Sequence, residues 1–210
     1  MTVSIANNTG FDASTTKLDI GDADVLVDAD GRPIVSKEDL LEDSTVVSVT
    51  KDNFVAVSSI LSSDANEDGE MFTIYLSSLP SSVSVWNINN AAVDLSQGNN
   101  RDDVFHIGDV NNNGYIDSVD ASQVAYAVSL YTEGVLTVSI ADGNLSYYFP
   151  YIPSSASSAI ADTNLNGKIN HVDQYNIMDF YTYLSIGYSM EEATYIAQSD
   201  GNYCGQEWSP

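Results

Sequence analysis

Two twelve-residue stretches of the chain follow one pattern, and this duplication constrains the fold more than any other feature. The first stretch runs from Asp109 to Asp120 and the second from Asp162 to Asp173. In both, residues with side-chain oxygens stand at positions one, three, five, nine and twelve, with Gly at six and Ile at eight. Alternate positions of a tight loop can converge on one point, and Gly permits a sharp turn that a Cβ would oppose. The pattern therefore predicts two related loops that each gather oxygen atoms.

Converging oxygens of this kind favour a hard divalent cation, and the spacing is that of a calcium-binding loop. One such loop arises easily by chance, whereas two copies, each followed by a helix-like run, predict two bound Ca²⁺ ions. The residues at position seven, Tyr115 and Lys168, would contribute only their backbone carbonyl oxygens. The predicted ligands are Asp109, Asn111, Asn113, Tyr115, Asp117 and Asp120 in the first loop, and Asp162, Asn164, Asn166, Lys168, Asn170 and Asp173 in the second.

Two departures from the general calcium-loop pattern point to one family. Both loops close with Asp rather than with a bidentate Glu. The sequence of residues 102–108 predicts an extended linker, not a helix that leads into the first loop. A loop with only an exiting helix, duplicated and closed by Asp, resembles the F-hand repeats of dockerin modules from cellulosome-type assemblies. The resemblance covers roughly residues 105–197, and its signatures are Gly-Asp-Val-Asn at 108–111, Ala-Asp-Thr-Asn at 161–164 and Gly-x-Ile before each closing Asp.

The resemblance to dockerins implies a non-catalytic adaptor that binds a cohesin module of a scaffold or cell-surface protein, and hence an extracellular location. In that family, contacts with cohesin come from the tenth and eleventh loop positions and from the surface of the following helix. Matching positions of the two repeats differ here, as Tyr126 and Asp179 do, so we expect one binding orientation in which one helix dominates. The candidate contacts are Ser118, Val119, Ser122, Ala125, Tyr126, Ser129, Leu130, His171, Val172, Tyr175, Met178, Asp179, Thr182 and Tyr183.

Charge and composition limit the partners. The 210 residues include 30 acidic and 6 basic ones, a net charge of −24, which argues against nucleic acid and an anionic membrane as partners. Acidity suits calcium binding and equally the solubility of a secreted protein, and we expect a monomer when the chain is free. No stretch approaches the ~18 apolar residues of a membrane-spanning helix, and no signal peptide is visible. Cys204 is the only cysteine, which excludes an intramolecular disulfide and a zinc cluster.

The first half of the chain predicts β structure. Short, partly alternating runs are separated by Gly-, Pro- and Asp-rich turns, which favours an antiparallel sandwich. Residues 27–34 and 68–76, followed by Leu79-Pro80, resemble the immunoglobulin-like X modules that precede dockerins, which implies a supporting module. A single helical turn is expected at Lys37–Glu42. The expected strands are 2–6, 24–27, 45–50, 54–60, 71–76, 83–88 and 91–95.

The second half predicts helices after each loop. Residues 121–131 and 174–184 show helical periodicity, each too short to be stable alone, so the two apolar stripes should be buried. An insertion between the loops carries a hairpin signal at 135–149, and Ser189 with Glu192 forms a capping-box pattern that begins a closing helix at 189–197. The stripes are Val124, Ala127, Val128 and Tyr131, and Ile177, Phe180, Tyr181 and Leu184.

These elements predict a two-domain chain. An all-β immunoglobulin-like sandwich would occupy residues 1–104, and an all-α dockerin with two calcium loop–helix motifs and a hairpin-like insertion would occupy 105–197. Residues 198–210 would form a loose tail.

Enzymatic activity is not expected, because the sequence has no His-Glu-x-x-His, Gly-x-Ser-x-Gly or phosphate-binding Gly-Lys motif and only two histidines. Two other functions stay open. The chain could be a calcium sensor without a cohesin partner, or residues 1–104 could bind carbohydrate through Trp86 and nearby Tyr side chains. Carbohydrate binding needs exposed aromatic rings, whereas Trp86 lies in an alternating run that predicts burial.

Overall fold

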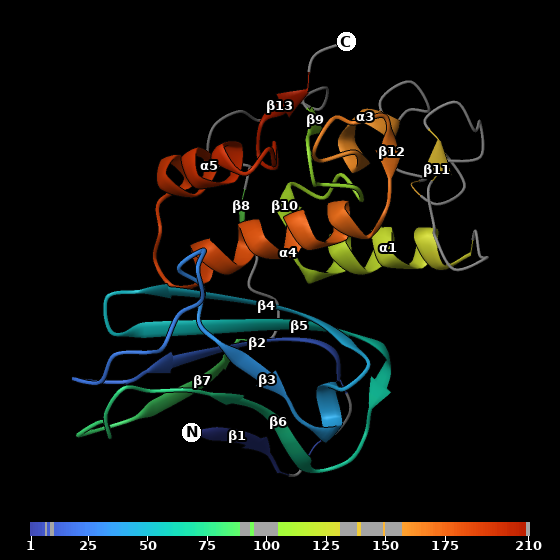
Figure 1. The fold of residues 1–210 in the computed structure, drawn as a ribbon. Coiled ribbons are helices and arrows are strands. Elements are labelled where there is room, and N and C mark those ends of the chain that lie inside the picture. Colours follow the sequence, from blue (N-terminus) through green and yellow to red (C-terminus); the bar gives the residue numbers. More distant parts are fainter. Residues whose placement is uncertain are drawn as a thin grey trace. The chain divides into compact units, whose positions relative to one another are not determined.

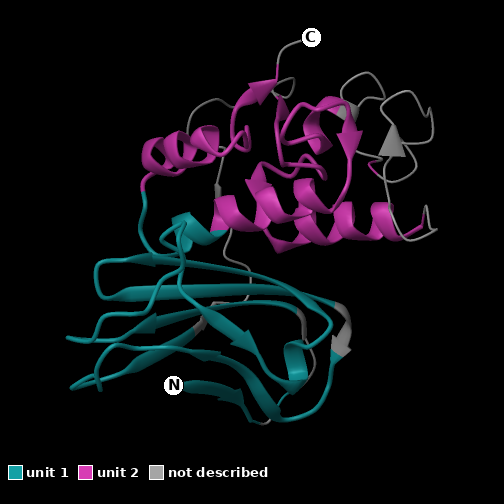
Figure 2. Cartoon of the chain, in the orientation of Figure 1, with its two compact units in different colours: residues 1–91, 182–188 teal, residues 92–181, 189–210 magenta. Residues whose placement is uncertain are grey.

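The computed structural model describes residues 1–6, 8, 11–88, 93–94, 105–130, 138–139, 149 and 157–208 (Figure 1). They form two compact units, which Figure 2 shows in different colours. Unit 1 comprises Met1–Ala91 and Thr182–Tyr188, and unit 2 comprises Ala92–Tyr181 and Ser189–Pro210. A short segment from late in the sequence therefore belongs to the N-terminal unit, which the sequence did not predict.

Unit 1 is built from two antiparallel sheets. One has the strand order β4-β5-β2-β7 and the other the order β1-β6-β3. Apolar side chains from both sheets, such as Leu18 and Val55 from one and Phe72 and Ile74 from the other, form one buried cluster, and this burial holds the sheets together. The strands are β1 (Thr2–Ile5), β2 (Phe11–Asp19), β3 (Val35–Lys37), β4 (Ser44–Lys51), β5 (Phe54–Ala65), β6 (Gly69–Ile74) and β7 (Ser84–Ile88).

Strand β2, which pairs with β5 on one side and β7 on the other, was not predicted. Its sequence is rich in Ser and Thr, which obscures the apolar alternation of a buried strand. These side chains are nevertheless buried, because they pair with hydroxyl groups of β5. Ser14 Oγ lies 2.9 Å from Ser59 Oγ, and Thr15 Oγ1 lies 2.9 Å from Ser58 Oγ. Hydrogen bonds between facing hydroxyls offset the cost of removing them from water.

The segment Thr182–Tyr188 is bonded to the four-stranded sheet within unit 1. Thr182 Oγ1 donates a hydrogen bond to Ser58 Oγ at 2.7 Å, and the Tyr188 hydroxyl donates to the carbonyl of Thr50 at 3.1 Å. The ammonium group of Lys51 lies 4.3 Å from the centroid of the Tyr188 ring. Unit 1 is therefore incomplete without residues that follow both loops in the sequence.

Two local predictions in unit 1 had different outcomes. The helical turn expected at Lys37–Glu42 is confirmed as the 3-10 helix η1 (Asp39–Leu41). The strand expected at 24–27 is wrong, because that run makes only isolated bridges, from Val25 to Leu76 and from Val27 to Pro33. Proline has no N–H with which to extend a ladder of hydrogen bonds.

Unit 2 corrects the predicted fold class. The chain is mixed α/β, and the expected all-α C-terminal domain is wrong, because the described part of unit 2 contains antiparallel strand pairs β10-β8, β11-β12 and β13-β9. The two loops themselves form β10 and β12, whose backbone N–H and C=O groups need partners that the helices cannot provide. The strands are β8 (Val93–Asp94), β9 (Phe105–His106), β10 (Tyr115–Ile116), β11 (Val138–Ser139), β12 (Lys168–Ile169) and β13 (Glu207–Trp208).

The two principal helices begin earlier than predicted, directly after the ninth loop position. They are α1 (Ser118–Ser129) and α4 (His171–Ser185), the last turn of which belongs to unit 1. The Asp117 carboxylate accepts a hydrogen bond from the N–H of Val119 at 2.7 Å, so this candidate ligand also caps α1. No helix in the described ranges is long and apolar enough to cross a bilayer. Of the predicted stripes, Val124, Ala127, Val128, Ile177, Phe180 and Tyr181 are buried, Leu184 is half-buried, and Tyr131 lies outside the described residues.

Two shorter helices complete unit 2. A five-residue helix, α3 (Ser157–Ala161), precedes the second loop. The closing helix is confirmed as α5 (Met190–Ser199), with the predicted capping box between Ser189 and Glu192. The predicted hairpin at 135–149 lies mostly outside the described residues, although its residues in β11 pair with β12.

The expected loose tail after residue 197 is wrong as far as Trp208. Helix α5 continues to Ser199, and β13 then pairs with β9 just before the first loop. Cys204 is fully buried, and Gly205 adopts a φ of 81°, with space so limited that a Cβ there would lie 2.6 Å from the Phe180 ring. Residues 209–210 lie outside the described residues.

Candidate functional site

The two loops share one backbone conformation. At position four, Asn112 and Leu165 have positive φ angles of 53° and 55°, and at position six Gly114 and Gly167 both have a φ of 84°. A positive φ is unfavourable for Leu, so its occurrence at the matching position indicates that the loop conformation is imposed by the pattern and not by that residue. The duplication seen in the sequence is therefore a duplication of structure.

The first carboxylate of each loop is held by backbone N–H groups of the same loop. Asp109 accepts hydrogen bonds from Asn113 N at 3.1 Å and Gly114 N at 3.0 Å. The matching bonds of Asp162 come from the N–H groups at positions five and six of the second loop, at 3.0 and 2.7 Å. These bonds draw the backbone of positions one to six around the carboxylate.

The closing carboxylates reach back from the helices into the loops. Asp120 accepts hydrogen bonds from Asn111 N at 3.2 Å and Asp117 N at 3.0 Å. Asp173 accepts one from Asn170 N at 2.8 Å and two from Thr163, whose N–H and hydroxyl lie 2.8 and 3.0 Å from the same oxygen. Although Asp is one methylene shorter than Glu, the closing Asp of each loop therefore bonds to a residue near the start of the loop and to the residue at position nine.

Burial makes the charges of the first loop costly. Asp109, Asp117 and Asp120 are 3%, 8% and 0% exposed. Desolvation, with repulsion from Asp117, raises the pKa of Asp109 to about 6 although backbone N–H groups oppose the shift. Desolvation and repulsion from Asp109 and Asp117 raise the pKa of Asp120 to about 8. Neutralisation of these carboxylates, by protons or by a divalent cation, would relieve this cost.

The second loop shows the same effect with fewer carboxylates. Asp162 and Asp173 are both almost fully buried, at 1% and 0% exposure. Desolvation raises the pKa of Asp162, and desolvation with repulsion from Asp162 raises the pKa of Asp173 to about 6. The other candidate oxygens of this loop come from amide and backbone groups.

The donor chemistry of both loops fits calcium, because carboxylate, amide and carbonyl oxygens are what this ion prefers. Within the described ranges, no group of three or more His, Cys, Asp or Glu side chains is arranged to hold a metal ion. The two carboxylate oxygens of Asp120 and of Asp173 are turned to N–H or O–H donors of their own loops. Asn111 and Asn113 also bond within the first loop, through their side-chain oxygens to Asn113 N and Tyr115 N at 3.0 and 2.8 Å.

The candidate cohesin contacts differ sharply between the repeats. In the first repeat, Val119, Tyr126 and Leu130 are 46%, 61% and 48% exposed, Ser129 is exposed, and the remaining candidates are half-buried. In the second repeat only His171 and Val172, at the start of α4, are exposed, and Tyr175 is half-buried. The other four, Met178, Asp179, Thr182 and Tyr183, are buried.

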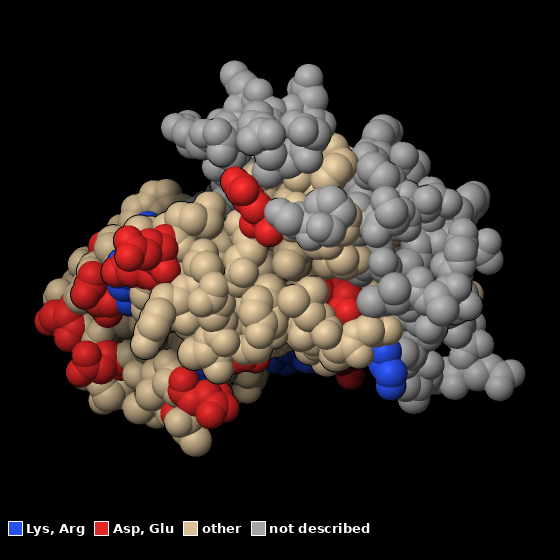
Figure 3. Space-filling model, turned by 90° about the horizontal axis from the view of Figure 1, so that it is seen from above, with Lys and Arg blue, Asp and Glu red and all other residues tan. Residues whose placement is uncertain are grey.

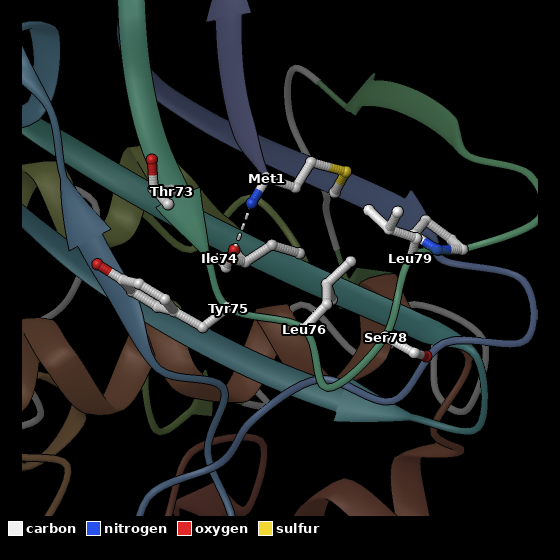
Figure 4. Close-up of a pocket in the computed structure, with 8 residues that line it drawn as sticks. Met1, Thr73, Ile74, Tyr75, Leu76, Ser78 and Leu79 are labelled. Atoms are coloured by element: carbon white, nitrogen blue, oxygen red, sulfur yellow. Dashed lines mark hydrogen bonds between the residues drawn. The ribbon is translucent and has the colours of Figure 1, made fainter.

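The surface elsewhere offers two further features. Acidic side chains recur over the face drawn in Figure 3, with few basic ones among them, as the composition of 30 acidic and 6 basic residues implies. A hollow of ≈ 770 Å³ in unit 1 is lined by Met1, Leu76, Leu79 and their neighbours (Figure 4). Its lining is mainly apolar, and the hydrogen bond drawn there joins the amino group of Met1 to the carbonyl of Ile74 at 2.8 Å.

The exposure of Trp86 differs from what the sequence predicted. The alternating run around it predicted burial, whereas its side chain is 45% exposed on the sheet-edge strand β7. Its neighbour Val85 is 53% exposed, so both faces of β7 are open at this point. Alternation predicts which residues share a face, but a strand at a sheet edge need not have either face covered.

Comparison of the chain with protein-family models, with curated proteins and with solved structures finds no match.

Sequence reasoning missed the residues that support the second loop from outside its ligand positions. Asn176 Nδ2 donates to Thr163 Oγ1 at 3.0 Å, and Thr163 in turn bonds to Asp173. A signal was present, because the matching residue of the first loop is Val110. A hydroxyl at this position in only one of the two repeats indicates that the closing carboxylates of the two loops have different hydrogen-bond partners.

Proposed function

We propose that the chain is a calcium-dependent, non-catalytic adaptor that binds a cohesin-type module and so joins an extracellular assembly. The observation that carries the proposal is the pair of loops with one backbone conformation and buried, mutually repelling carboxylates. Calcium would be held by the oxygens at the six ligand positions of each loop and would neutralise their charge. Since α1 and α4 both begin at the loops, the ion would also fix the start of each helix.

The partner would dock mainly on the first repeat. Its exposed side chains, Val119, Tyr126 and Leu130, combine two aliphatic groups with an aromatic ring, the kind of surface that forms the centre of protein interfaces. In the second repeat, Thr182 and Tyr183 are committed within unit 1, where Thr182 bonds to Ser58 and the Tyr183 ring packs edge-on against Tyr188. That leaves the start of α4, at His171 and Val172, as the accessible part of the second repeat.

The test is binding of the full chain to a panel of cohesin modules, measured by calorimetry with excess calcium and with EDTA. We expect at least one cohesin to bind in calcium and none in EDTA. Calcium binding without binding to any cohesin would favour the alternative that the chain is a calcium sensor. Absence of calcium binding would overturn the proposal.

Exposure of Trp86 favours a second candidate function for unit 1. An exposed indole can stack on a sugar ring, and its N–H can donate a hydrogen bond. Retention of the chain on insoluble polysaccharides should then fall in a Trp86→Ala variant. Equal retention of both proteins would remove this candidate.

A further inference from the structure

The closing carboxylate of the second loop is held by a side-chain relay. One oxygen of Asp173 accepts hydrogen bonds from both the N–H and the hydroxyl of Thr163, at 2.8 and 3.0 Å. The hydroxyl oxygen itself accepts a hydrogen bond from Asn176 Nδ2 at 3.0 Å. Thr163 and Asp173 are both fully buried. A hydroxyl has one proton, and since the amide group of Asn176 can only donate to it, that proton is directed to the carboxylate.

The C-terminal segment fixes the backbone of both relay residues. Tyr203 N donates to the carbonyl of Thr163 at 2.8 Å. Asn202 Nδ2 donates to the carbonyl of Asn176 at 2.9 Å, and Asn202 is only 2% exposed. Neither member of the relay can therefore shift its backbone without breaking a second hydrogen bond. This is the arrangement by which supporting residues hold a ligand in one orientation.

The first repeat serves as an internal comparison. At the matching positions, 53 residues earlier in the sequence, it has Val110 and Gln123 in place of Thr163 and Asn176. Val110 has no hydroxyl, and within the described ranges Asp120 accepts its hydrogen bonds from the backbone N–H groups of Asn111 and Asp117. Within the described part of the chain, the buried Gln123 Oε1 has no hydrogen-bond partner. The relay is thus a feature of the second repeat.

We infer that Thr163 is a positioning residue for the calcium site of the second loop: its hydroxyl fixes the rotamer of Asp173, and Asn176 fixes the direction of the hydroxyl. The inference rests on the proposed calcium binding. Asp is one methylene shorter than Glu, so an incorrectly rotated carboxylate cannot reach the ion, and an oriented one avoids the entropy loss of being ordered on binding. Supporting residues of this kind typically change metal affinity by about 10- to 100-fold.

The experiment is a calcium titration of the full chain by calorimetry, with the number of bound ions counted by native mass spectrometry. Thr163→Val keeps the shape of the side chain and removes the hydroxyl, so we expect one of two sites to weaken by about 10-fold or more. Thr163→Ser restores the hydroxyl and should recover most of the affinity. Thr15→Val removes a buried hydroxyl that bonds to Ser58 in unit 1, and should leave both sites unchanged.

The outcomes separate the inference from the proposed function. A wild-type chain that binds no calcium overturns both. Two intact sites in Thr163→Val overturn the inference alone, as does an equal loss in Thr163→Val and Thr163→Ser. A loss in Thr15→Val as large as that in Thr163→Val would mean general destabilisation, and would also refute a positioning role. If Thr163→Val does not fold, Asn176→Ala tests the same relay, and unchanged affinity in that variant contradicts it.

Discussion

At the scale of single residues, the main feature of the loops is a set of buried carboxylates whose charged form is disfavoured by the loss of solvation. Burial is the largest cause of the raised pKa values of Asp109, Asp120 and Asp173, and repulsion between carboxylates adds to it. Without a cation, the folded chain therefore binds protons that the unfolded chain has already released. Between about pH 4 and pH 8 the metal-free fold binds more protons than the unfolded state, so its free energy of unfolding falls as pH rises.

This proton uptake predicts that the proposed calcium binding depends on pH. At about pH 7, where Asp120 with its pKa of about 8 is mostly protonated, binding of calcium should release protons. Calorimetry in two buffers of different ionisation enthalpy measures this release directly. In EDTA, the melting temperature of unit 2 should be lower at about pH 8 than at about pH 5, and excess calcium should remove the difference. A melting temperature that is independent of pH in EDTA, with no proton release, contradicts the assignment.

At the scale of elements, the two principal helices have the same relation to their loops but different surroundings. The candidate contacts of the first repeat are exposed or half-buried, whereas those of α4 beyond Tyr175 are buried. A two-fold exchange of the repeats on a partner would need the same chemistry and the same access at both helices. The two faces meet neither condition, so a single orientation stays the prediction.

Substitutions on the two helices should therefore have unequal effects on cohesin binding. Replacing Tyr126 and Leu130 on α1 with Ala should weaken binding by about 30-fold or more, since truncation of a central aromatic anchor commonly costs at least 2 kcal/mol. Replacing Tyr175 on α4 with Ala should cost much less. Tyr195→Ala is the matched control, because this tyrosine is 76% exposed on α5, outside the proposed surface.

The measurement is the dissociation constant of each variant for a cohesin that binds the wild-type chain. Equal, mild losses from α1 and α4 that become severe only in combination would indicate two interchangeable orientations instead.

At the scale of the whole molecule, calcium should stabilise one unit more than the other. An ion that binds only the folded state at a thousand-fold excess over Kd contributes about 4 kcal/mol, which for a unit of this size raises the melting temperature on the order of 15 °C. EDTA should therefore lower the transition of unit 2 by that order and that of unit 1 far less. Hydrogen exchange read by peptide identifies the unit, with β4 and β5 reporting unit 1 and α1 reporting unit 2.

The control is the Thr15→Val variant. Loss of its buried hydroxyl bond should lower the stability of unit 1 by about 1 kcal/mol without changing the effect of EDTA on α1. Protection of α1 that is the same in calcium and in EDTA would be incompatible with calcium-dependent folding.

Local features could be predicted from the sequence wherever a residue acts on its immediate neighbours. The capping box of Ser189 and Glu192 and the turn at η1 depend on contacts a few residues apart, and both were predicted. The apolar stripes of α1 and α4 follow from helical periodicity and are buried wherever the structure describes them, apart from the half-buried Leu184. For the same reason, the repeated Asp, Asn and Gly spacing determined two loops of one conformation.

Contacts between distant parts of the chain were decided by the tertiary structure. The Ser and Thr residues of β2 become buried only because hydroxyl groups of β5 face them, and no local pattern records that partner. Trp86 is exposed because β7 is a sheet edge, although its alternation is that of a covered strand. The prediction of an all-α domain was wrong for the same reason, since β10 and β12 pair with β8 and β11, which lie in other parts of the sequence.

The sequence by itself determined two loops of one backbone conformation, because the repeated Asp, Asn and Gly positions lie within twelve residues and act on their near neighbours. Only the tertiary structure decided how those loops are supported and which surface stays free. Thr163 is supported by Asn176 and Tyr203, and the α4 segment after Tyr181 belongs to unit 1 while the face of α1 remains exposed. Hydrogen bonds and burial depend on which distant segments contact one another, and the spacing of side chains along the sequence does not predict those contacts.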